Sequence, residues 1–312
     1  MGPFAVETRG LSKSFESVEA VRSLDLEVRE GEMFSLVGPD GAGKTTTIRM
    51  LCGLITPTAG GATVLGYDLV RQSGEIKNRI GYLSQKFSLY GDLTVDENIE
   101  FFAEIHRVRD FRKRRAELLE FTRLTPFRGR LAERLSGGMR QKLALACTLV
   151  HTPRLIFLDE PTTGVDPVSR RDFWAILSAL LKEGTTIIMS TPYMDEAERA
   201  SRVGLIAGGR LIAADTPRAV KGLMRGTIVE IICPEIRRAF GVLKALPGVR
   251  EVQLFGDRLN VVVDIPDSQV PRIEAALAAA GIPVLAERRL SPSLENVFIS
   301  ITESAPSEAG HA

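Results

Sequence analysis

Residues 38–45, with the sequence GPDGAGKT, constrain the fold of this chain more than any other stretch. They match the spacing G-x-x-x-x-G-K-[ST] and lie between an apolar run, residues 33–37, and a helical pattern over residues 45–54. Glycines at this spacing let backbone N–H groups surround phosphate groups, and the start of the following helix adds the positive end of its dipole. Lys44 would reach the β- and γ-phosphates of a nucleotide, and the Thr45 hydroxyl would bind Mg²⁺. The alternative is a chance match, against which the flanking strand and helix argue.

Short apolar runs bounded by turn residues recur along the first part of the chain, at residues 32–38, 154–160 and 185–191. Each is followed by a helical pattern, which is typical of buried parallel strands in an α/β fold. Residues 86–150 differ, because amphipathic helical patterns replace the strands there. We therefore predict an α/β domain of the P-loop NTPase type over residues 1–224, with a helical subdomain at about residues 86–150.

A different order of elements begins after this domain. Residues 226–302 have the patterns of a strand, a helix, two strands, a helix, a strand and a helix. The βαββαβ order indicates a small ferredoxin-like α+β module. Because no cluster of catalytic residue types occurs in it, we expect a structural or regulatory accessory domain. Residues 303–312 are expected to form a disordered tail.

The composition limits the partners of the chain. The formal net charge is only +1, which gives no reason to expect nucleic acid as a partner. The basic run at residues 112–115 is expected to be a solvated helix face. No apolar run approaches the roughly 20 residues needed to span a bilayer, and the start of the chain has no signal-peptide pattern. Cys52, Cys147 and Cys233 are isolated, so we expect buried, reduced thiols and no zinc site.

Two further motifs could take part in nucleotide chemistry. Asp159 and Glu160 directly follow the apolar residues 155–158. In that position one carboxylate can hold Mg²⁺ and the second can activate water, although a lone acidic pair usually belongs to a solvated loop. The stretch 135–141, LSGGMRQ, places small residues before a helical pattern. Such a turn could bind an anion or could simply cap the helix.

These motifs, in this order over roughly residues 8–224, resemble those of the ATP-binding cassette (ABC) ATPases. The resemblance implies a two-lobed ATPase that binds ATP and Mg²⁺. It also implies a head-to-tail dimer, in which each nucleotide lies between the phosphate loop of one subunit and the LSGGM turn of the other. The residues that it assigns to nucleotide binding are Phe15, Gly38, Pro39, Asp40, Gly41, Ala42, Gly43, Lys44, Thr45, Thr46, Ser136, Gly137, Gly138 and Asp166.

The resemblance implies particular roles for some of these side chains. Phe15 resembles the aromatic residue that stacks on adenine, although a core phenylalanine is the alternative. Glu160 resembles the catalytic base. Gln85 resembles the glutamine that contacts Mg²⁺ and the attacking water and links the helical lobe to a membrane partner. Asp159 would join the Mg²⁺ ligands, and Asp166 resembles the aspartate that crosses the dimer.

Longer stretches narrow the resemblance to exporters. The sequences QKFSLYGDLTVDENI, LACTLV and GVDPVSRRDFW are similar to the amino-terminal half of YbhF-type tandem exporter ATPases, and SLENVFISIT is similar to extensions in the second ABC exporter class. The resemblance implies an ATP-hydrolysing exporter subunit for multiple drugs or small hydrophobic molecules. It would be peripheral on the cytoplasmic face of the membrane and would touch the membrane only through a separate integral permease.

The sequence leaves the assembly and two other functions open. It contains one phosphate loop, so we expect a second ATPase subunit in a homodimer or a heterodimer. The first alternative function is that of a non-transport cassette protein. The second is that of a regulatory module that binds ATP with little hydrolysis.

Pro192 departs from the family pattern, in which a histidine at this place contacts the γ-phosphate. Thr191 is expected to cap a helix that starts with Pro192, where the missing N–H costs nothing, and Asp195 and Glu196 would favour the first turn. Losing one preorganised transition-state donor typically lowers a rate by about 10²–10³. We therefore expect the nucleotide site of this chain to be degenerate, while its LSGGM turn can complete the site of a partner.

Overall fold

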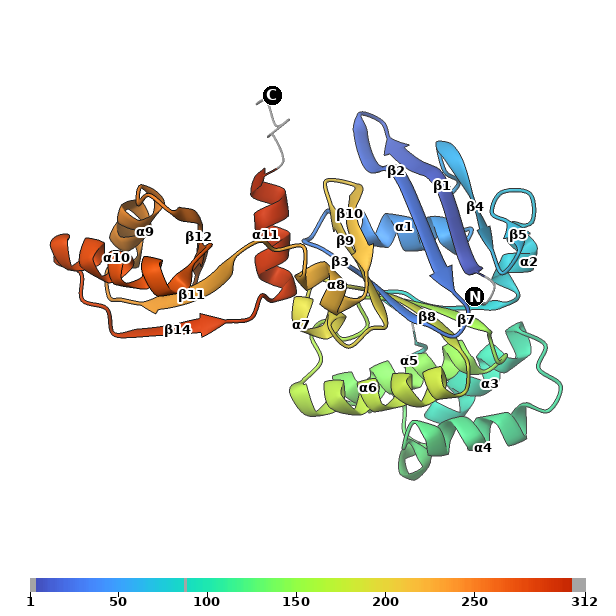
Figure 1. The fold of residues 1–312 in the computed structure, drawn as a ribbon. Coiled ribbons are helices and arrows are strands. Elements are labelled where there is room, and N and C mark those ends of the chain that lie inside the picture. Colours follow the sequence, from blue (N-terminus) through green and yellow to red (C-terminus); the bar gives the residue numbers. More distant parts are fainter. Residues whose placement is uncertain (1–3, 87–88, 305–312) are drawn as a thin grey trace. The chain divides into compact units, whose positions relative to one another are not determined.

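The chain separates into two units in the computed structural model, Met1–Asp215 and Thr216–Ala312. The structure describes residues 4–86 and 89–304, without the side chains of residues 303 and 304. Figure 1 shows the elements of both units, coloured along the sequence.

One sheet of the first unit is antiparallel and has the strand order β2-β1-β4-β5. Its strands are β1 (Phe4–Phe15), β2 (Val18–Arg29), β4 (Ala59–Val64) and β5 (Tyr67–Asp68). Leu24, Leu26 and Val28 of β2 are buried and alternate with exposed neighbours, as the two-residue period of a half-buried strand requires. The β1–β2 hairpin matters for function because it places Ala20 against the phosphate loop.

The second sheet has the order β10-β9-β3-β8-β7-β6. Its strands are β3 (Met33–Val37), β6 (Ile80–Leu83), β7 (Leu155–Asp159), β8 (Thr186–Thr191), β9 (Arg202–Ala207) and β10 (Arg210–Asp215). All neighbouring pairs are parallel except β9 and β10. Every residue of β3, β7 and β8 is buried, as expected of parallel strands covered on both faces. The three predicted strands are therefore confirmed, and their carboxyl ends lie along one edge of the sheet.

Among the described residues of the first unit, four helices lie outside the helical region: α1 (Lys44–Leu51), α2 (Ser73–Lys77), α6 (Pro167–Lys182) and α7 (Met194–Ala197). Helix α1 packs on β7 and β8. Apolar side chains from the helix and the strands, among them Leu36, Ile48, Leu51, Phe157 and Ile188, form one buried cluster. This packing fixes the start of α1 beside the carboxyl ends of the strands.

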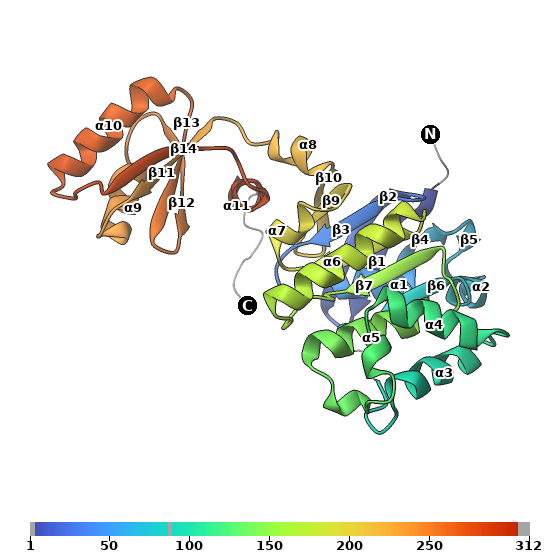
Figure 2. The same cartoon turned by 90° about the horizontal axis from the view of Figure 1, so that it is seen from below.

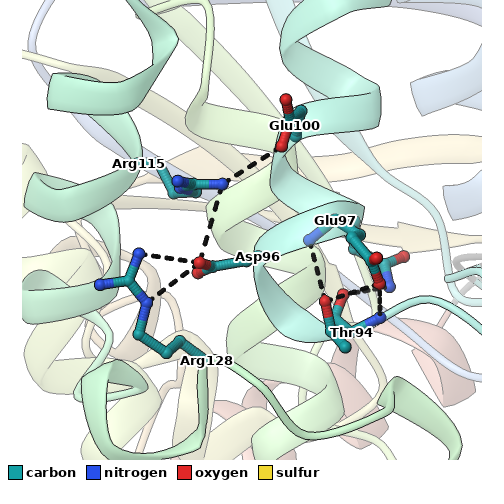
Figure 3. Close-up of polar contacts among 7 residues, drawn as sticks. Thr94, Asp96, Glu97, Glu100, Arg115 and Arg128 are labelled. Carbon is teal, nitrogen blue, oxygen red and sulfur yellow. Dashed lines mark hydrogen bonds and ion pairs between the residues drawn. The ribbon is translucent and has the colours of Figure 1, made fainter.

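Helices replace strands between residues 86 and 150 where the structure describes them, as predicted. They are α3 (Val95–Ile105), α4 (Phe111–Phe121) and α5 (Gly137–Leu149), with short 3₁₀ segments at Thr125–Phe127 and Ala132–Arg134. Helix α3 begins with a capping box, in which the Thr94 hydroxyl accepts from the Glu97 amide and the Glu97 carboxylate accepts from the Thr94 amide (Figure 3).

Ion pairs join α3 to its neighbours (Figure 3). Asp96 accepts hydrogen bonds from Nε and Nη2 of Arg128 at 3.0 and 2.8 Å. Nη1 of Arg115 lies 3.7 Å from Asp96 Oδ2 and 3.3 Å from Glu100 Oε2. The prediction that residues 112–115 form a solvated helix face is therefore wrong for Arg115, whose side chain is only 16% exposed because the acidic side chains of α3 hold it.

The second unit contains a four-stranded sheet in the order β12-β13-β11-β14, with every neighbouring pair antiparallel. Its elements are α8 (Pro217–Lys221), β11 (Thr227–Ile232), α9 (Ile236–Lys244), β12 (Val249–Phe255), β13 (Arg258–Val263), α10 (Pro266–Ala279), β14 (Ala286–Leu290) and α11 (Leu294–Ser304) (Figure 2). Val229, Val261, Leu243 and Leu277 belong to one core between the sheet and helices α9 and α10. The predicted ferredoxin-like βαββαβ order is confirmed.

The ends of this unit differ from the sequence-based boundaries. It begins at Thr216 and not after residue 224, because α8 contacts α11 and so belongs to the second unit. Helix α11 continues to Ser304, so the expected disordered tail, residues 303–312, starts inside a helix, and residues 305–312 lie outside the described residues. Within residues 4–86 and 89–304, no helix combines the length and apolar character needed to cross a membrane.

Candidate nucleotide-binding site

The phosphate loop, residues 38–43, joins the end of β3 to the start of α1. Gly41 and Gly43 have φ angles of 76° and 103°, in the left-handed region that favours glycine. A Cβ at Gly43 would lie 2.4 Å from the Ala20 carbonyl oxygen, and one at Gly38 would lie 2.1 Å from that of Ile206. The loop can therefore follow this path only with glycine at these positions. The first turn of α1 follows directly, and the N–H groups at the start of a helix have no partners within the helix.

Lys44 is held inside the loop. Its ammonium donates to the carbonyl oxygens of Gly38 and Pro39 at 2.9 and 3.0 Å. The same nitrogen lies 3.3 Å from Glu160 Oε1. The lysine is only 4% exposed, so its charge depends on these partners, and a phosphate oxygen could take the place of the glutamate.

Asp159, the last residue of β7, is completely buried. Its Oδ1 accepts hydrogen bonds from the hydroxyls of Thr45 at 2.9 Å and Ser190 at 2.6 Å. Its Oδ2 is buried and has no hydrogen-bond partner among the described residues. A buried carboxylate oxygen without a partner, next to a threonine hydroxyl, is the type of oxygen ligand set that Mg²⁺ prefers. Thr45 and Asp159 therefore fit a Mg²⁺ ion.

Glu160 has a φ of 48°, which is uncommon for a residue with a side chain and often occurs at functional sites. Its amide donates to Ser190 Oγ at 3.0 Å and to the Ser190 carbonyl oxygen at 3.2 Å. Gln85 Nε2 donates to Glu160 Oε2 at 2.9 Å. The Ser190 side chain thus binds both the Asp159 carboxylate and the backbone amide of Glu160. Its place just before the end of β8 is the only signal that the sequence offers for this role.

A cavity of about 280 Å³ lies between these groups. Its lining residues are Ala20, Asp40, Gly41, Gly43, Lys44, Thr45, Thr46, Gln85 and Glu160. All of them except Ala20 are expected from the sequence. Ala20 reaches the cavity from the β1–β2 hairpin, and its residue type gives no hint of this position. Gly38, Pro39 and Ala42 complete the loop around Lys44.

The turn before α5 is not part of this cavity. Ser136 caps α5 by accepting a hydrogen bond from the Met139 amide at 3.3 Å. Gly138 packs against α6 so closely that a Cβ would lie 2.1 Å from Ser169 Oγ. Ser136 and Gly137 are exposed. Within one chain the turn therefore forms an exposed surface that is separate from the cavity.

Asp166 and Phe15 are also absent from the lining of the cavity. Asp166 caps α6 by accepting from the amides of Val168 and Ser169, and the Ser169 hydrogen bonds lower the pKa of its carboxyl. Phe15, the last residue of β1, is 47% exposed, and Lys13 Nζ lies 5.0 Å from its ring centroid. The alternative of a core phenylalanine is therefore wrong.

Pro192 lies in a bend, not at the first helical position that the sequence predicts. Thr191 is still the last residue of β8, and helix α7 begins only at Met194. The Thr191 hydroxyl accepts from the Tyr193 amide at 3.0 Å, so it stabilises the bend and not the start of the helix. Asp195 and Glu196 lie in the first turn of α7, as predicted, and Glu196 is buried there, with 2% exposure. No local pattern of residues indicates the contacts that hold Glu196 in this buried position.

Comparison with known proteins gives consistent matches. The family described as "ABC transporter" matches residues 21–163. The chain is 40% identical over 314 residues to the probable multidrug ABC transporter ATP-binding protein YbhF of Escherichia coli, covering 98% of this chain and 53% of YbhF. It thus spans about half the length of that relative.

Two further matches cover nearly the whole of the other protein. The daunorubicin resistance ATP-binding protein DrrA2 of Streptomyces coeruleorubidus is 36% identical, over 97% of this chain and 96% of DrrA2. A solved dimeric ATP-binding cassette, in a post-hydrolysis state with ADP and phosphate, is 26% identical with a TM-score of 0.59, over 68% of this chain and 98% of the cassette.

Proposed function

The chain belongs to the ABC transporter family of ATP-binding proteins, and we propose that it is the ATP-binding and hydrolysing subunit that drives a separate membrane permease of an exporter. The observation that carries the proposal is that two pairs of side chains meet here: Thr45 Oγ1 lies 2.9 Å from Asp159 Oδ1, and Lys44 Nζ lies 3.3 Å from Glu160 Oε1. A cation, a hydroxyl and two carboxylates at the end of parallel strands are the groups that phosphoryl transfer to water requires.

Each side chain has a distinct part in the proposed reaction. Lys44 would exchange its contact with Glu160 for the β- and γ-phosphate oxygens of ATP. Thr45 and Asp159 would hold Mg²⁺, which neutralises phosphate charge when bound. Glu160, freed from Lys44, would accept the proton of the attacking water, and Gln85 would keep that carboxylate oriented.

We infer that the exposed turn at Ser136 and Gly137 and the loop at Asp166 meet a second ATPase subunit. Neither lines the cavity of its own chain, and both present polar groups outward. Phe15 is half exposed on the hairpin that carries Ala20, a place from which it could stack on adenine. The dimeric cassette with ADP and phosphate supports this arrangement. A homodimer and a heterodimer are both compatible with these surfaces.

The proposed membrane partner has a suitable place to dock. A second cavity of about 280 Å³ has walls that include Cys52, Leu54, Ile80 and Phe102, which join the α1 and β6 region to α3. Leu54 is 50% exposed, and the nearby Ile105 is 57% exposed. Apolar side chains of a permease would cover these groups. The chain would then act at the cytoplasmic face of the membrane, and the names of YbhF and DrrA2 support drug-like small molecules as cargo.

Pro192 favours a second candidate function, in which the chain binds ATP and signals with little hydrolysis. Its ring has no donor for a γ-phosphate. Restoring a histidine should therefore raise steady-state ATP hydrolysis by about 10–10³-fold, the range that one transition-state contact supplies. The experiment compares phosphate release by Pro192→His and the unchanged chain, each alone and with its permease.

The outcomes separate the two functions. Hydrolysis that rises in the variant and drives transport with the permease supports the exporter subunit with a degenerate site. Hydrolysis that is absent from both proteins in every assembly would favour the signalling function. Fast hydrolysis by the unchanged chain, with no gain from the histidine, would show that another group replaces it.

A further inference from the structure

Glu196 is a buried carboxylate outside the nucleotide cavity. It lies in α7 and is 2% exposed, although acidic residues in the first turn of a short helix are usually solvated. Its Oε2 accepts a hydrogen bond from Thr162 Oγ1 at 2.6 Å and another from Thr191 Oγ1 at 3.2 Å. Both threonines are themselves buried. One carboxylate oxygen therefore ties together two segments that are distant in the sequence.

The second oxygen of Glu196 faces a third segment. Its Oε1 lies 3.2 Å from Arg170 Nε in the first part of α6. The N–H group does not point along this line, so the contact is an ion pair and not a hydrogen bond. The Arg170 guanidinium also lies 5.1 Å from the centroid of the Tyr193 ring. Arg170 thus supplies the positive charge that a buried carboxylate needs.

The segment that contains Thr162 belongs to the machinery proposed above. Thr162 follows Glu160 by two residues, in the loop that leads to Asp166. This loop is a series of turns, in which the Thr163 amide donates to the Glu160 carbonyl at 3.3 Å and the Val165 amide donates to the Thr162 carbonyl at 3.1 Å. Its shape therefore determines where the Glu160 carboxylate and the dimer-facing Asp166 lie relative to each other.

Thr191 connects Glu196 to the bend at Pro192. Proline has no N–H, so the bend cannot be fixed by an amide at that residue. Instead the Thr191 hydroxyl accepts from the Tyr193 amide and donates to Glu196. The Glu196 carboxylate thus binds both the residue before the bend and the loop after Glu160.

We propose that Glu196 is a positioning residue. It keeps the loop of residues 160–166 in a fixed position relative to the bend at Pro192 during ATP hydrolysis. The proposal rests on the function proposed above. It assigns no contact with nucleotide to Glu196, because Glu196 is not among the residues that line the cavity. Loss of the carboxylate should loosen the loop that carries Glu160 and leave the phosphate loop in place, so turnover should suffer while ATP affinity does not.

Hydrogen–deuterium exchange of the full chain tests this positioning role directly, with and without Mg-ATP. In Glu196→Ala, exchange at the amides of Thr163 and Val165 should rise by about tenfold, as expected from loss of a hydrogen bond to a charged group. Glu196→Gln keeps an acceptor oxygen for the two hydroxyls and should restore most of the protection. Asp195→Ala, which removes the exposed neighbouring carboxylate, is the matched control and should change neither amide.

The turnover number and the ATP affinity, measured together, distinguish a positioning role from a purely structural one. In the complex with its permease, Glu196→Ala should lower kcat by about tenfold and leave the ATP affinity of the chain within about twofold. If Glu196→Ala does not fold, Thr162→Val removes one hydroxyl with little change in shape and should produce the same local rise in exchange.

Two results would overturn the proposal. The first is unchanged exchange at Thr163 and Val165 in both Glu196→Ala and Thr162→Val. The second is a uniform rise across the first unit with equal losses of ATP affinity and kcat, which would make Glu196 a general stabiliser. Failure of the proposed function appears differently, as a complex that binds ATP and never hydrolyses it, and the exchange experiment still decides the role of Glu196 in that case.

Discussion

Replacing Glu160 by glutamine should strengthen ATP binding while it stops hydrolysis. In the structure, Glu160 Oε1 lies 3.3 Å from Lys44 Nζ, and the two side chains are 8% and 3% exposed. ATP can reach the ammonium only when this ion pair breaks. Glutamine has the same shape and can still accept from Gln85, but it neither holds Lys44 by charge nor repels the γ-phosphate.

The size of the effect follows from the distance. Opposite unit charges 3.3 Å apart attract by about 5 kcal/mol at an effective dielectric constant of about 20. Removal of both charges from water offsets most of that attraction. We take about 1.4 kcal/mol as the net contribution, which corresponds to about tenfold tighter binding of ATP by Glu160→Gln.

Equilibrium binding of a fluorescent ATP analogue in the presence of Mg²⁺ measures this difference, and phosphate release by the complex measures hydrolysis. Glu104→Gln, which neutralises an exposed glutamate of α3, is the control and should bind like the unchanged chain. An unchanged or weaker affinity for Glu160→Gln would refute the argument that the ion pair competes with ATP. Turnover within about threefold of the unchanged complex would refute the assignment of Glu160 as the base.

Two further predictions concern stability and the accessory unit. Burial, and then the nearby His106, lower the pKa of His151 to about 4, whereas an unfolded histidine has a pKa of about 6.5. The unfolded chain therefore binds a proton between these values that the folded chain does not. The free energy of unfolding should consequently fall by about 1–2 kcal/mol from pH 7 to pH 5, allowing for the partial exposure of the ring. His151→Gln should lose this part of the pH dependence in urea titrations, and an identical dependence in both proteins would contradict it. Removal of Thr216–Ala312 should leave the affinity for Mg-ATP within about twofold, because the cavity is lined only by the first unit; a large loss in a truncated chain that still folds would show that the accessory unit supports the site.

The sequence predicted those parts of the molecule that depend on short, continuous patterns. The strand β3, the phosphate loop and the start of α1 follow one another within residues 33–51, so a local motif could fix them. The three buried strands and the βαββαβ order of the second unit were also visible as runs of apolar residues. Asp159 and Glu160 could be placed because they end such a run.

The remaining features depend on contacts between distant residues. Ala20 enters the cavity because its carbonyl oxygen meets Gly43 across 23 residues, and Ser190 reaches Asp159 across the β7–β8 pair. Arg115 is held by acidic side chains of another helix. The bend at Pro192 differs from the prediction because the Thr191 hydroxyl bonds to the Tyr193 amide, which delays the helix until residue 194. The residue types along the chain do not indicate which distant residues will contact one another.

The central claim, that the buried cluster around Lys44 is an ATP site, is tested most directly by equilibrium binding of Mg-ATP to Lys44→Ala. The account predicts at least about tenfold weaker binding, because the phosphates lose charge-assisted hydrogen bonds that backbone amides cannot replace. Lys182→Ala, which removes an exposed lysine in the last turn of α6, should bind normally. An affinity of Lys44→Ala within about threefold of the unchanged chain would contradict the assignment.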